Sequence, residues 1–346
     1  PPKIQASKIK EADGKASAIS PVVIKIPDPI TMPITIIELS NNPSWRSSFM
    51  EWSFLFILKL GQGYNLQDND ENTLNYFVMI HRTPEDFLDR NTYPLAQPES
   101  KTFTDLVNEC KKSLNKTGAC ILKNFIHQSI LDRMVLETER IVDKSHFCKD
   151  NHNVFFEKDD TSLPVDHPLR IREDTSLNSI PYDLMDPTDA LHQLYNWYPL
   201  INFLSAVLGH TLYRMADPMA ALTLNVMNEH QNHGWHYDES QITITLLIQK
   251  PEAGGVFECV PDLRKFDTDN HSKLGAILNG SDEGLVPLNV EPGDLLIFAG
   301  FYSLHRVTPV VGKTTRYVGT LCYKDRPNVL NSPEVQQLFY GRVNQG

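Results

Sequence analysis

The feature that most constrains the fold of this chain is a run of short segments, between residues 221 and 323, in which apolar and polar residues alternate. A period of two residues is typical of half-buried β-strands, and turn signals rich in Pro, Gly and Asp separate the segments. We expect strands at residues 221–227, 236–238, 242–249, 256–260, 285–290, 294–299, 304–309 and 315–323. So many short strands predict a mainly β fold of the α+β class, a double-stranded β-helix (jelly roll, cupin-like), rather than an alternating parallel sheet.

Helical segments are expected before these strands. Apolar residues recur at helical spacing in residues 103–114 and 129–142, and a third helix is expected over residues 188–208. A short strand at residues 120–122 separates the first two. Residues 262–283 form a long polar insertion between two of the strands. These helices are the supporting elements of the predicted jelly roll.

The chain divides into three parts by composition. Residues 1–20 are rich in Lys, Ala and Ser and are expected to form a flexible tail. Residues 21–100 form an N-terminal mixed α/β segment of unknown role, in which β-branched residues predict strands at 22–26 and 34–37. Residues 101–346 form the predicted jelly-roll domain.

The bulk composition limits the possible partners and the compartment. The formal net charge of -11 argues against nucleic acid as the main partner, because a phosphate backbone attracts basic surfaces. Apolar runs are shorter than the roughly 20 residues that a membrane span needs, so no membrane partner is expected. Five widely spaced cysteines without a CxxC pair favour reducing conditions, in the cytoplasm or an organelle lumen, and no leader is visible. The oligomeric state stays open.

A possible metal site begins in the segment GWHYD at residues 234–238. His236 and Asp238 lie two residues apart on an expected strand and therefore point to the same face. Alone the pair is a weak signal, because about one such pair is expected by chance in a chain with 12 histidines. His305, on a later expected strand, supplies a third ligand. Two histidines and one carboxylate form a facial triad with open coordination positions, which suits iron(II) oxygenases.

Two polar residues on neighbouring strands are candidates for binding a cosubstrate. Arg316, on the last expected strand, can bind a carboxylate through two parallel hydrogen bonds. Its alternative role is a salt bridge within the strand. Asn225, on the strand before the motif, is a second candidate, with an inward polar residue satisfied by backbone as the alternative.

Other charged and imidazole side chains are weaker candidates. Glu239, Arg172 and Arg306 could contact a polar or zwitterionic substrate, although a surface or structural charge is the simpler interpretation for each. His230 and His233 precede the motif, and a solvated loop or an orienting role is favoured over metal ligation for both.

The order of these elements resembles the iron(II)/2-oxoglutarate dioxygenase superfamily over residues 101–346. The matching features are the strand with His236 and Asp238, the long insertion, the Pro-Gly-Asp turn at residues 292–294, His305 and then Arg316. The resemblance implies iron(II), 2-oxoglutarate and O2 as cofactors, with Arg316 on the distal carboxylate of 2-oxoglutarate. It implies an oxidoreductase that attacks an unactivated C–H bond of a small-molecule substrate and releases succinate and CO2. Some members carry Ser two residues after the arginine, where this chain has Val318, so a second partner for that carboxylate is unassigned.

A finer resemblance is carried by residues 234–238 together with the TITLLIQ strand at 243–249. This pattern is similar to the branch that contains free-amino-acid radical halogenases and their hydroxylase relatives. The halogenases carry Gly or Ala where this chain has Asp238, which opens a position for halide. The resemblance therefore implies an amino-acid-like substrate with hydroxylation or oxidative ring closure, as in natural-product biosynthesis. Algal kainoid synthases, which close a ring on an N-prenylated glutamate, are another group that the chain resembles.

Two other classes of function remain open from the residues alone. The same His236, Asp238 and His305 could hold zinc in a hydrolase, since zinc accepts such ligand sets. The barrel could also be a non-catalytic binding module, with residues 1–100 as an interaction segment. Arg316 and the jelly-roll pattern favour iron over zinc, and the intact ligand set argues against a non-catalytic relic.

Overall fold

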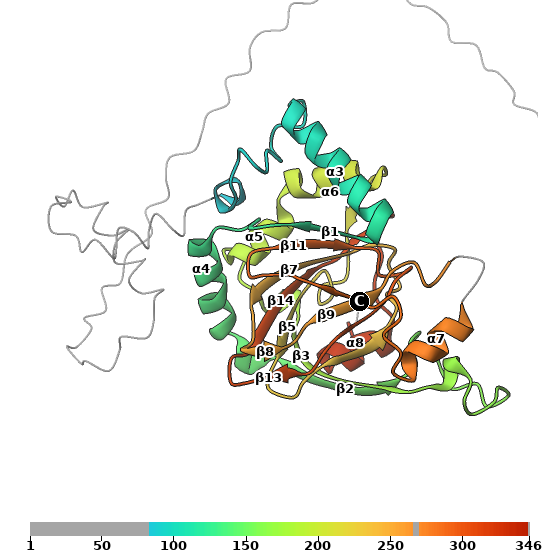
Figure 1. Ribbon diagram of the computed structural model, residues 1–346. Helices are drawn as coiled ribbons and strands as arrows, with labels where there is room; N and C mark the ends of the chain where they lie inside the picture. Colours follow the sequence, from blue (N-terminus) through green and yellow to red (C-terminus); the bar gives the residue numbers. More distant parts are fainter. Residues whose placement is uncertain (1–82, 266–269, 345–346) are drawn as a thin grey trace, which may run out of the picture. The chain divides into compact units, whose positions relative to one another are not determined.

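The computed structural model describes residues 83–265 and 270–344, which all belong to a compact unit formed by residues 68–346. The expected tail at 1–20 and the strands expected at 22–26 and 34–37 lie outside the described residues. The described part is a mixed α/β structure with a large antiparallel sheet (Figure 1). No helix in it is both long and apolar enough to cross a bilayer.

The larger sheet has seven strands in the order β1-β11-β7-β14-β5-β3-β2, and each neighbouring pair is antiparallel. Its strands are β1 (Ala119–Leu122), β2 (His146–His152), β3 (Glu173–Ile180), β5 (Leu222–Met227), β7 (Thr243–Gln249), β11 (Leu295–Phe298) and β14 (Arg316–Leu321). Because residues paired across antiparallel strands share a face, the register assigns each side chain to one of two layers. Arg316 pairs with Met227 and Val318 pairs with Asn225, so these four residues share one face.

The smaller sheet has four strands in the order β10-β9-β12-β6. They are β6 (His233–His236), β9 (Phe257–Val260), β10 (Val286–Leu288) and β12 (Leu304–Val307). His236 pairs with His305, which in turn pairs with Cys259, so these three side chains share a face. Two short ladders join β8 (Ala253–Gly254) to β13 (Val310–Val311) and β4 (Tyr213–Arg214) to β15 (Tyr323–Lys324).

The two sheets meet through an apolar layer. Cys259 of the smaller sheet packs with Leu296 and Phe298 of β11 and with Ala119 of β1. All four of these side chains are buried. The histidine-bearing face of the smaller sheet is therefore turned toward the larger sheet, and the space between the sheets is where the expected site residues converge.

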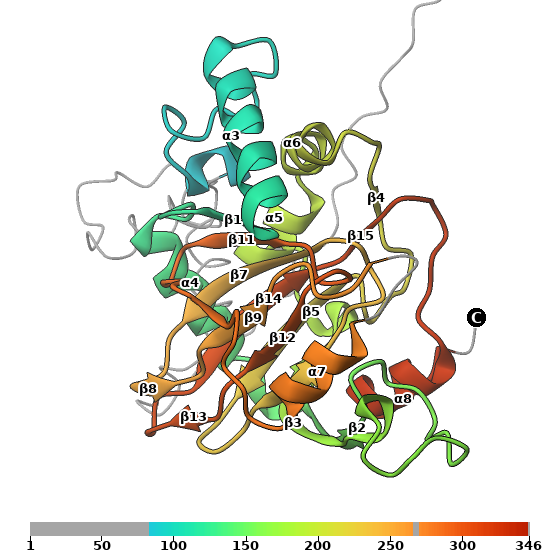
Figure 2. The ribbon, with the colours of Figure 1, turned by 45° about the vertical axis from the view of Figure 1, so that its right-hand side comes forward.

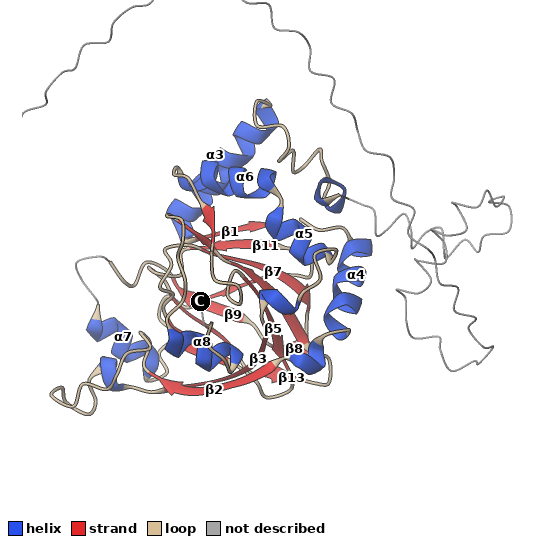
Figure 3. Ribbon diagram, turned by 180° about the vertical axis from the view of Figure 1, so that it is seen from behind, coloured by secondary structure: helices blue, strands red, loops and turns tan. Residues whose placement is uncertain are grey.

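Helices cover the other face of each sheet. The helices are α3 (Lys101–Thr117), α4 (Gln128–Glu139), α5 (Ala190–Asn196), α6 (Tyr198–Leu208), α7 (His271–Leu278) and α8 (Pro333–Tyr340), with 3-10 turns η3 (Pro84–Phe87), η4 (Val142–Lys144), η5 (Pro168–Arg170) and η6 (Tyr182–Leu184). Helices α3 to α6 share the main hydrophobic core with the outward residues of β5, β7, β11 and β14 (Figures 1 and 3). Helix α7 packs its Leu274 and Ile277 against Val260 and Leu304 of the smaller sheet. Figure 2 shows this helix beside β12.

The ends of α3 illustrate how local sequence fixes an element. The Ser100 hydroxyl accepts a hydrogen bond from the Phe103 amide at 3.1 Å, which caps the first turn. Gly118 ends the helix in the left-handed region with φ 69°, and its amide donates to the Leu114 carbonyl. The chain then enters β1 directly, at the edge of the larger sheet.

Most expected elements have a counterpart in the structure, with some corrections. Seven of the eight expected strand segments contain a strand, although 315–323 is divided into β14 and β15. The strand expected at 236–238 lies earlier, at His233–His236, so Asp238 follows the strand and is not part of it. The helix expected at 188–208 breaks at Trp197, because Pro199 lacks an amide donor and would clash with the preceding turn of a continuous helix. The polar insertion at 262–283 contains α7. The strands β2 and β3 and the helix α8 were not expected.

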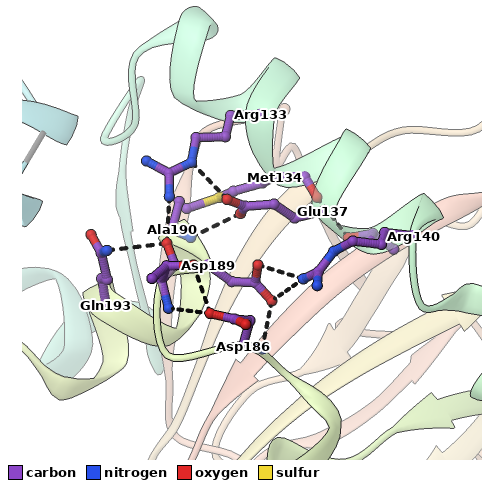
Figure 4. A network of polar contacts seen from close by, with 10 residues as sticks. Arg133, Met134, Glu137, Arg140, Asp186, Asp189, Ala190 and Gln193 are labelled. Atoms are coloured by element: carbon purple, nitrogen blue, oxygen red, sulfur yellow. Dashed lines mark hydrogen bonds and ion pairs between the residues drawn. The ribbon is translucent and has the colours of Figure 1, made fainter. Parts of the chain in front are cut away.

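A buried polar network ties α4 to the start of α5 (Figure 4). The Glu137 carboxylate accepts from Arg133 Nε at 2.6 Å and from the Ala190 amide at 2.8 Å. Arg140 donates to both oxygens of Asp189, at 2.6 and 2.8 Å. Since α4 packs against β7, the network holds part of the helical layer in place against the larger sheet.

We predict a pH-dependent contribution to stability from Glu137. Burial raises the pKa of this carboxyl to about 7, despite the opposing contacts with Arg133 and the Ala190 amide. A carboxyl with a raised pKa binds its proton more tightly in the folded state, so its stabilising effect falls as pH rises from the unfolded value through about 7. The wild type should therefore lose stability relative to Glu137→Gln between pH 5 and pH 8, by on the order of 1–3 kcal/mol.

Thermal unfolding of both proteins across this pH range measures the difference. All other groups titrate in both proteins, so their effects cancel in the comparison. A melting-temperature difference that does not change with pH would contradict the prediction.

Candidate metal centre

His236, Asp238 and His305 converge between the two sheets. One ligand atom from each residue lies within 4.8 Å of the others, and this is the cluster of metal-binding type found among residues 83–265 and 270–344. Nε2 of His236 lies 3.7 Å from Oδ1 of Asp238, and Nε2 of His305 lies 3.5 Å from the same oxygen. The two histidines come from directly paired positions on β6 and β12, and Asp238 follows the end of β6. The structure thus brings together the three residues that the sequence selected.

Hydrogen bonds to the backbone fix the orientation of both imidazoles. Nδ1–H of His236 donates to the Gly234 carbonyl at 2.8 Å, and Nδ1–H of His305 donates to the Ser303 carbonyl at 2.9 Å. A carbonyl can only accept, so Nδ1 carries the proton in the neutral ring and the lone pair remains on Nε2. Both Nε2 atoms are therefore directed at the carboxylate of Asp238 in the tautomer that binds a metal.

The electrostatics favour the protonation states that a metal requires. Burial lowers the pKa of His236 well below its usual value, and the neighbouring His233 and His305 lower it further. Burial acts to raise the pKa of Asp238, but the interactions with His305 and the hydrogen bond from Thr243 outweigh it, and the net shift is downward. A neutral imidazole beside an ionised carboxylate is the state in which these groups ligate a metal without first losing protons.

The spacing of the three donors suits one ion. Donor atoms about 2.1 Å from an ion and at right angles to one another would lie about 3.0 Å apart. The observed separations of 3.5 and 3.7 Å exceed that by roughly half an ångström. Two imidazoles and one carboxylate on one side of an ion are the donor set of mononuclear iron(II) sites, so the residues fit such a metal.

His233 is a site residue that the sequence analysis placed differently. A solvated loop or an orienting role is expected for His233. The loop prediction is wrong, because β6 extends back to His233, and its ring stacks on His236 with centroids 3.9 Å apart, which is compatible with an orienting role. Its Nε2 is buried without a hydrogen-bond partner, and burial lowers its pKa to about 3. His230 lies in an exposed turn with φ 70°, as expected. His233 lies on β6 and His230 lies before it, so a correct prediction of where this strand begins would have distinguished the two histidines.

Arg316 is a buried cation on the wall of the larger sheet. Its side chain shares a face with Met227, is 7% exposed, and contacts Met227 Sδ at 3.7 Å. No ion pair joins it to a carboxylate within the described ranges 83–265 and 270–344. Burial lowers its pKa to about 10, so the guanidinium stays charged at neutral pH. A buried charge is costly unless it is paired, so this position favours an anionic ligand.

Asn225 lies on the same face of the larger sheet as Arg316. It pairs with Val318 in the ladder between β5 and β14, and its amide donates to the Thr320 hydroxyl at 3.2 Å. This partner is a side chain, whereas the alternative interpretation expected backbone. The residue is half-buried and therefore lines the interior space near the cation.

The three candidate substrate residues are not gathered at the centre. Glu239 is exposed and directly follows Asp238, and it lines a cavity of 320 Å³. Arg172 is exposed immediately before β3. Arg306 binds Glu258 at 2.8 Å and lies over the Trp235 ring at 4.5 Å, on the face of β12 opposite to His305. Arg306 is thus engaged on the outer side, because adjacent strand residues point to opposite faces.

Comparison with known proteins identifies the family of this chain. Residues 103–337 match the model of the family HalD, halogenase D. The chain belongs to the halogenase D family. This family is part of the iron(II)/2-oxoglutarate oxygenase superfamily, which confirms the resemblance drawn from the sequence. The protein is an oxidoreductase whose cofactors are iron(II), 2-oxoglutarate and O2. No curated protein matches the chain.

The chain is also similar to several solved structures. One is an oxidoreductase of the 2OG-Fe(II) oxygenase family from Burkholderia pseudomallei, with 13% identity, a TM-score of 0.41, and coverage of 64% of this chain and 92% of that one. A prolyl hydroxylase from Trichoplax adhaerens has 16% identity, a TM-score of 0.44, and coverage of 65% and 91%. The carbocyclase SnoK from nogalamycin biosynthesis has 13% identity, a TM-score of 0.46, and coverage of 70% and 95%. At these levels of similarity, no substrate or activity is transferred to this chain.

Removal of any one ligand should abolish tight metal binding. We predict that His236→Ala, Asp238→Ala and His305→Ala each weaken iron(II) or cobalt(II) binding by more than the roughly 10–100-fold that changes around a metal's ligands cause. Titration of the metal-free proteins under anaerobic conditions measures the affinity. His127→Ala, which removes an exposed histidine at the start of α4, is the matched control and should bind metal like the wild type. A variant of the cluster with wild-type affinity would remove that residue from the ligand set.

Proposed function

We propose that this halogenase D family member oxidises a C–H bond of a small, amino-acid-like substrate by hydroxylation or oxidative ring closure, and does not halogenate it. The observation that carries the proposal is the Asp238 carboxylate, whose Oδ1 lies within 3.7 Å of both histidine Nε2 atoms. In the halogenases that the chain resembles, Gly or Ala stands at this position. The carboxylate fills the place that a halide would need.

The two antiparallel sheets form, in this proposal, the two walls of a double-stranded β-helix. The apolar layer around Cys259 and Phe298 closes the space between the walls on one side of the histidines. His236 and His305 come from the smaller wall, and Arg316 and Asn225 from the larger wall. A ligand that reaches both walls can therefore bind the metal at one end and the guanidinium at the other.

The protein residues bind, orient and shield the reactants. His236, Asp238 and His305 hold iron(II), which together with 2-oxoglutarate and O2 supplies the oxidising power for C–H cleavage and releases succinate and CO2. Arg316 binds the distal carboxylate of 2-oxoglutarate, which would neutralise the buried guanidinium. Besides His233 Nε2, the described residues contain one other buried polar side-chain atom without a partner, the Ser179 hydroxyl, which faces Asn225 across the ladder. Because buried polar atoms usually have hydrogen-bond partners, these unpaired atoms favour a polar ligand in the interior.

The cavity lined by Glu239 is our candidate for the substrate pocket, although the three metal-binding residues do not themselves line it. It is 320 Å³ in volume and is lined by Glu239 and Phe301, the residues that follow Asp238 and Gly300. Lys324, which donates to the Ser240 hydroxyl at 2.5 Å, and Arg326 add positive charge to the same cavity. A pocket of this size with charges of both signs fits a small zwitterion such as an amino acid, and a kainoid precursor falls in this class.

The expected outcome follows from the number of coordination positions. A facial triad leaves three positions on an octahedral ion. With His236, Asp238 and His305 holding the metal, 2-oxoglutarate and O2 would need the remaining positions, so a halide would have none of its own. The substrate radical would then gain oxygen, or lose a second hydrogen and form a ring or a double bond.

We predict that Arg316→Leu weakens the apparent affinity for 2-oxoglutarate. The change removes a charge-assisted, bidentate contact worth roughly 1.5–3 kcal/mol, which corresponds to about 10- to 150-fold. Succinate formation at increasing 2-oxoglutarate concentration measures it. Arg342→Leu, which removes an exposed arginine paired with Asp183, is the control. An unchanged titration in a folded Arg316→Leu protein would assign the carboxylate to another residue.

A further prediction concerns the products that the wild-type protein forms. With iron(II), 2-oxoglutarate, O2, excess chloride and an accepted amino-acid-like substrate, mass spectrometry should show a product that has gained one oxygen or lost two hydrogens. Succinate should form in the same reaction, which a zinc hydrolase would not produce. A chlorinated product would overturn the proposed role of Asp238.

A further inference from the structure

The turn after β11 is in direct contact with two of the metal-binding residues. The Gly300 carbonyl accepts a hydrogen bond from the Asp238 amide at 3.2 Å. Three residues later, the Ser303 carbonyl accepts the Nδ1–H of His305. The turn is itself braced, because the Tyr302 and Ser303 amides both donate to the Ala299 carbonyl at 3.1 Å. One rigid turn therefore sets the backbone of Asp238 and the ring of His305 relative to each other.

Gly300 leaves space that the Asp238 side chain fills. A Cβ atom built on Gly300 would overlap Asp238 Oδ2, and would lie 2.7 Å from its Cγ and 3.0 Å from its Cβ. The contacts with Oδ2 and Cγ are closer than real Cβ atoms approach other heavy atoms. Any other residue at position 300 would therefore push the carboxylate away from its observed place, or the turn away from Asp238.

Thr243 holds the same carboxylate oxygen from the other side. Its hydroxyl donates to Asp238 Oδ2, while Oδ1 faces the two histidines. Thr243 pairs with Phe298 across β7 and β11, so its position is fixed by the ladder that leads into the turn. The two oxygens of Asp238 thus have different environments: Oδ2 lies between a hydroxyl and a glycine, and Oδ1 is directed at the metal-binding nitrogens.

We propose that Gly300 and Thr243 form a notch that positions the Asp238 carboxylate for metal binding through Oδ1 alone. The hydrogen bond to Oδ2 disfavours bidentate ligation, which would use a coordination position that the cosubstrates need. The two residues are positioning residues that act through Asp238. The inference deepens the proposed function, since it explains how a carboxylate is accommodated at the position where related halogenases carry Gly or Ala.

The proposed notch predicts that the effects of substitutions at residues 238 and 300 depend on each other. A methyl group at position 300 conflicts with Asp238, but not with a glycine at 238, which has no carboxylate. The effects of Gly300→Ala and Asp238→Gly should therefore be non-additive. The readouts are thermal unfolding of the metal-free proteins and their affinity for cobalt(II), neither of which depends on substrate or turnover.

We expect Gly300→Ala to lower the melting temperature of the metal-free protein by several degrees and to weaken cobalt(II) binding at least about tenfold. In the Asp238→Gly background, the same Gly300→Ala change should leave the melting temperature within about one degree. Gly275→Ala is the control. Gly275 lies on α7, away from the cluster, and a methyl group there would lie 3.0 Å from Pro168. This variant should leave cobalt(II) affinity unchanged. An equal loss of stability in both backgrounds, or wild-type cobalt(II) affinity in Gly300→Ala, would overturn the notch.

Thr243→Val provides a second test should Gly300→Ala fail to fold. Valine keeps the shape of threonine but cannot donate to Oδ2, so cobalt(II) affinity should fall about tenfold, and Thr243→Ser should restore it. Wild-type affinity in Thr243→Val would contradict the proposal. Because all these measurements use metal binding and unfolding, the notch can hold even if the wild type were found to chlorinate a substrate, and the two ideas can fail separately.

Discussion

The whole site depends on two buried imidazoles that direct Nε2 at one oxygen of Asp238. Each ring is held by a hydrogen bond from Nδ1 to a carbonyl two residues earlier in its own chain segment, Gly234 or Ser303. Burial lowers the pKa of His236, and the contacts of Asp238 with His305 and Thr243 lower its pKa against the opposing effect of burial. A proton on Nε2 instead of Nδ1 would leave these histidines without a lone pair directed at the metal.

The two sheets divide the chemistry between them. The smaller sheet supplies the histidines, and the larger one supplies the buried guanidinium of Arg316, which has no carboxylate partner in the described part of the chain. The turn that joins β11 to β12 connects the sheets and contacts both Asp238 and His305. A halogenase D family fold is thereby combined with a cluster of two histidines and one carboxylate, and the proposed notch at Gly300 would position that carboxylate.

Sequence patterns predicted much of this arrangement, for reasons of strand geometry. The two-residue period located most of the strands, and the pair His236 and Asp238 was correctly selected, although β6 ends at His236 and the turn at Gly300 contacts the backbone of Asp238. The same rule could have shown that Arg306, next to His305, points outward. The polar strands β2 and β3 carry no such alternation of apolar residues, and the roles of Gly300 and Thr243 depend on a close approach between distant segments. That approach leaves no local signal in the sequence.

The central claim is that the Asp238 carboxylate, and no halide, completes the protein's ligand set. The X-ray absorption spectrum of the iron(II)-loaded wild type with 2-oxoglutarate and excess bromide tests this most directly, because bromide is a heavy scatterer. We expect a metal surrounded by nitrogen and oxygen neighbours alone, with and without bromide. A bromide neighbour at bonding distance from the metal would contradict it.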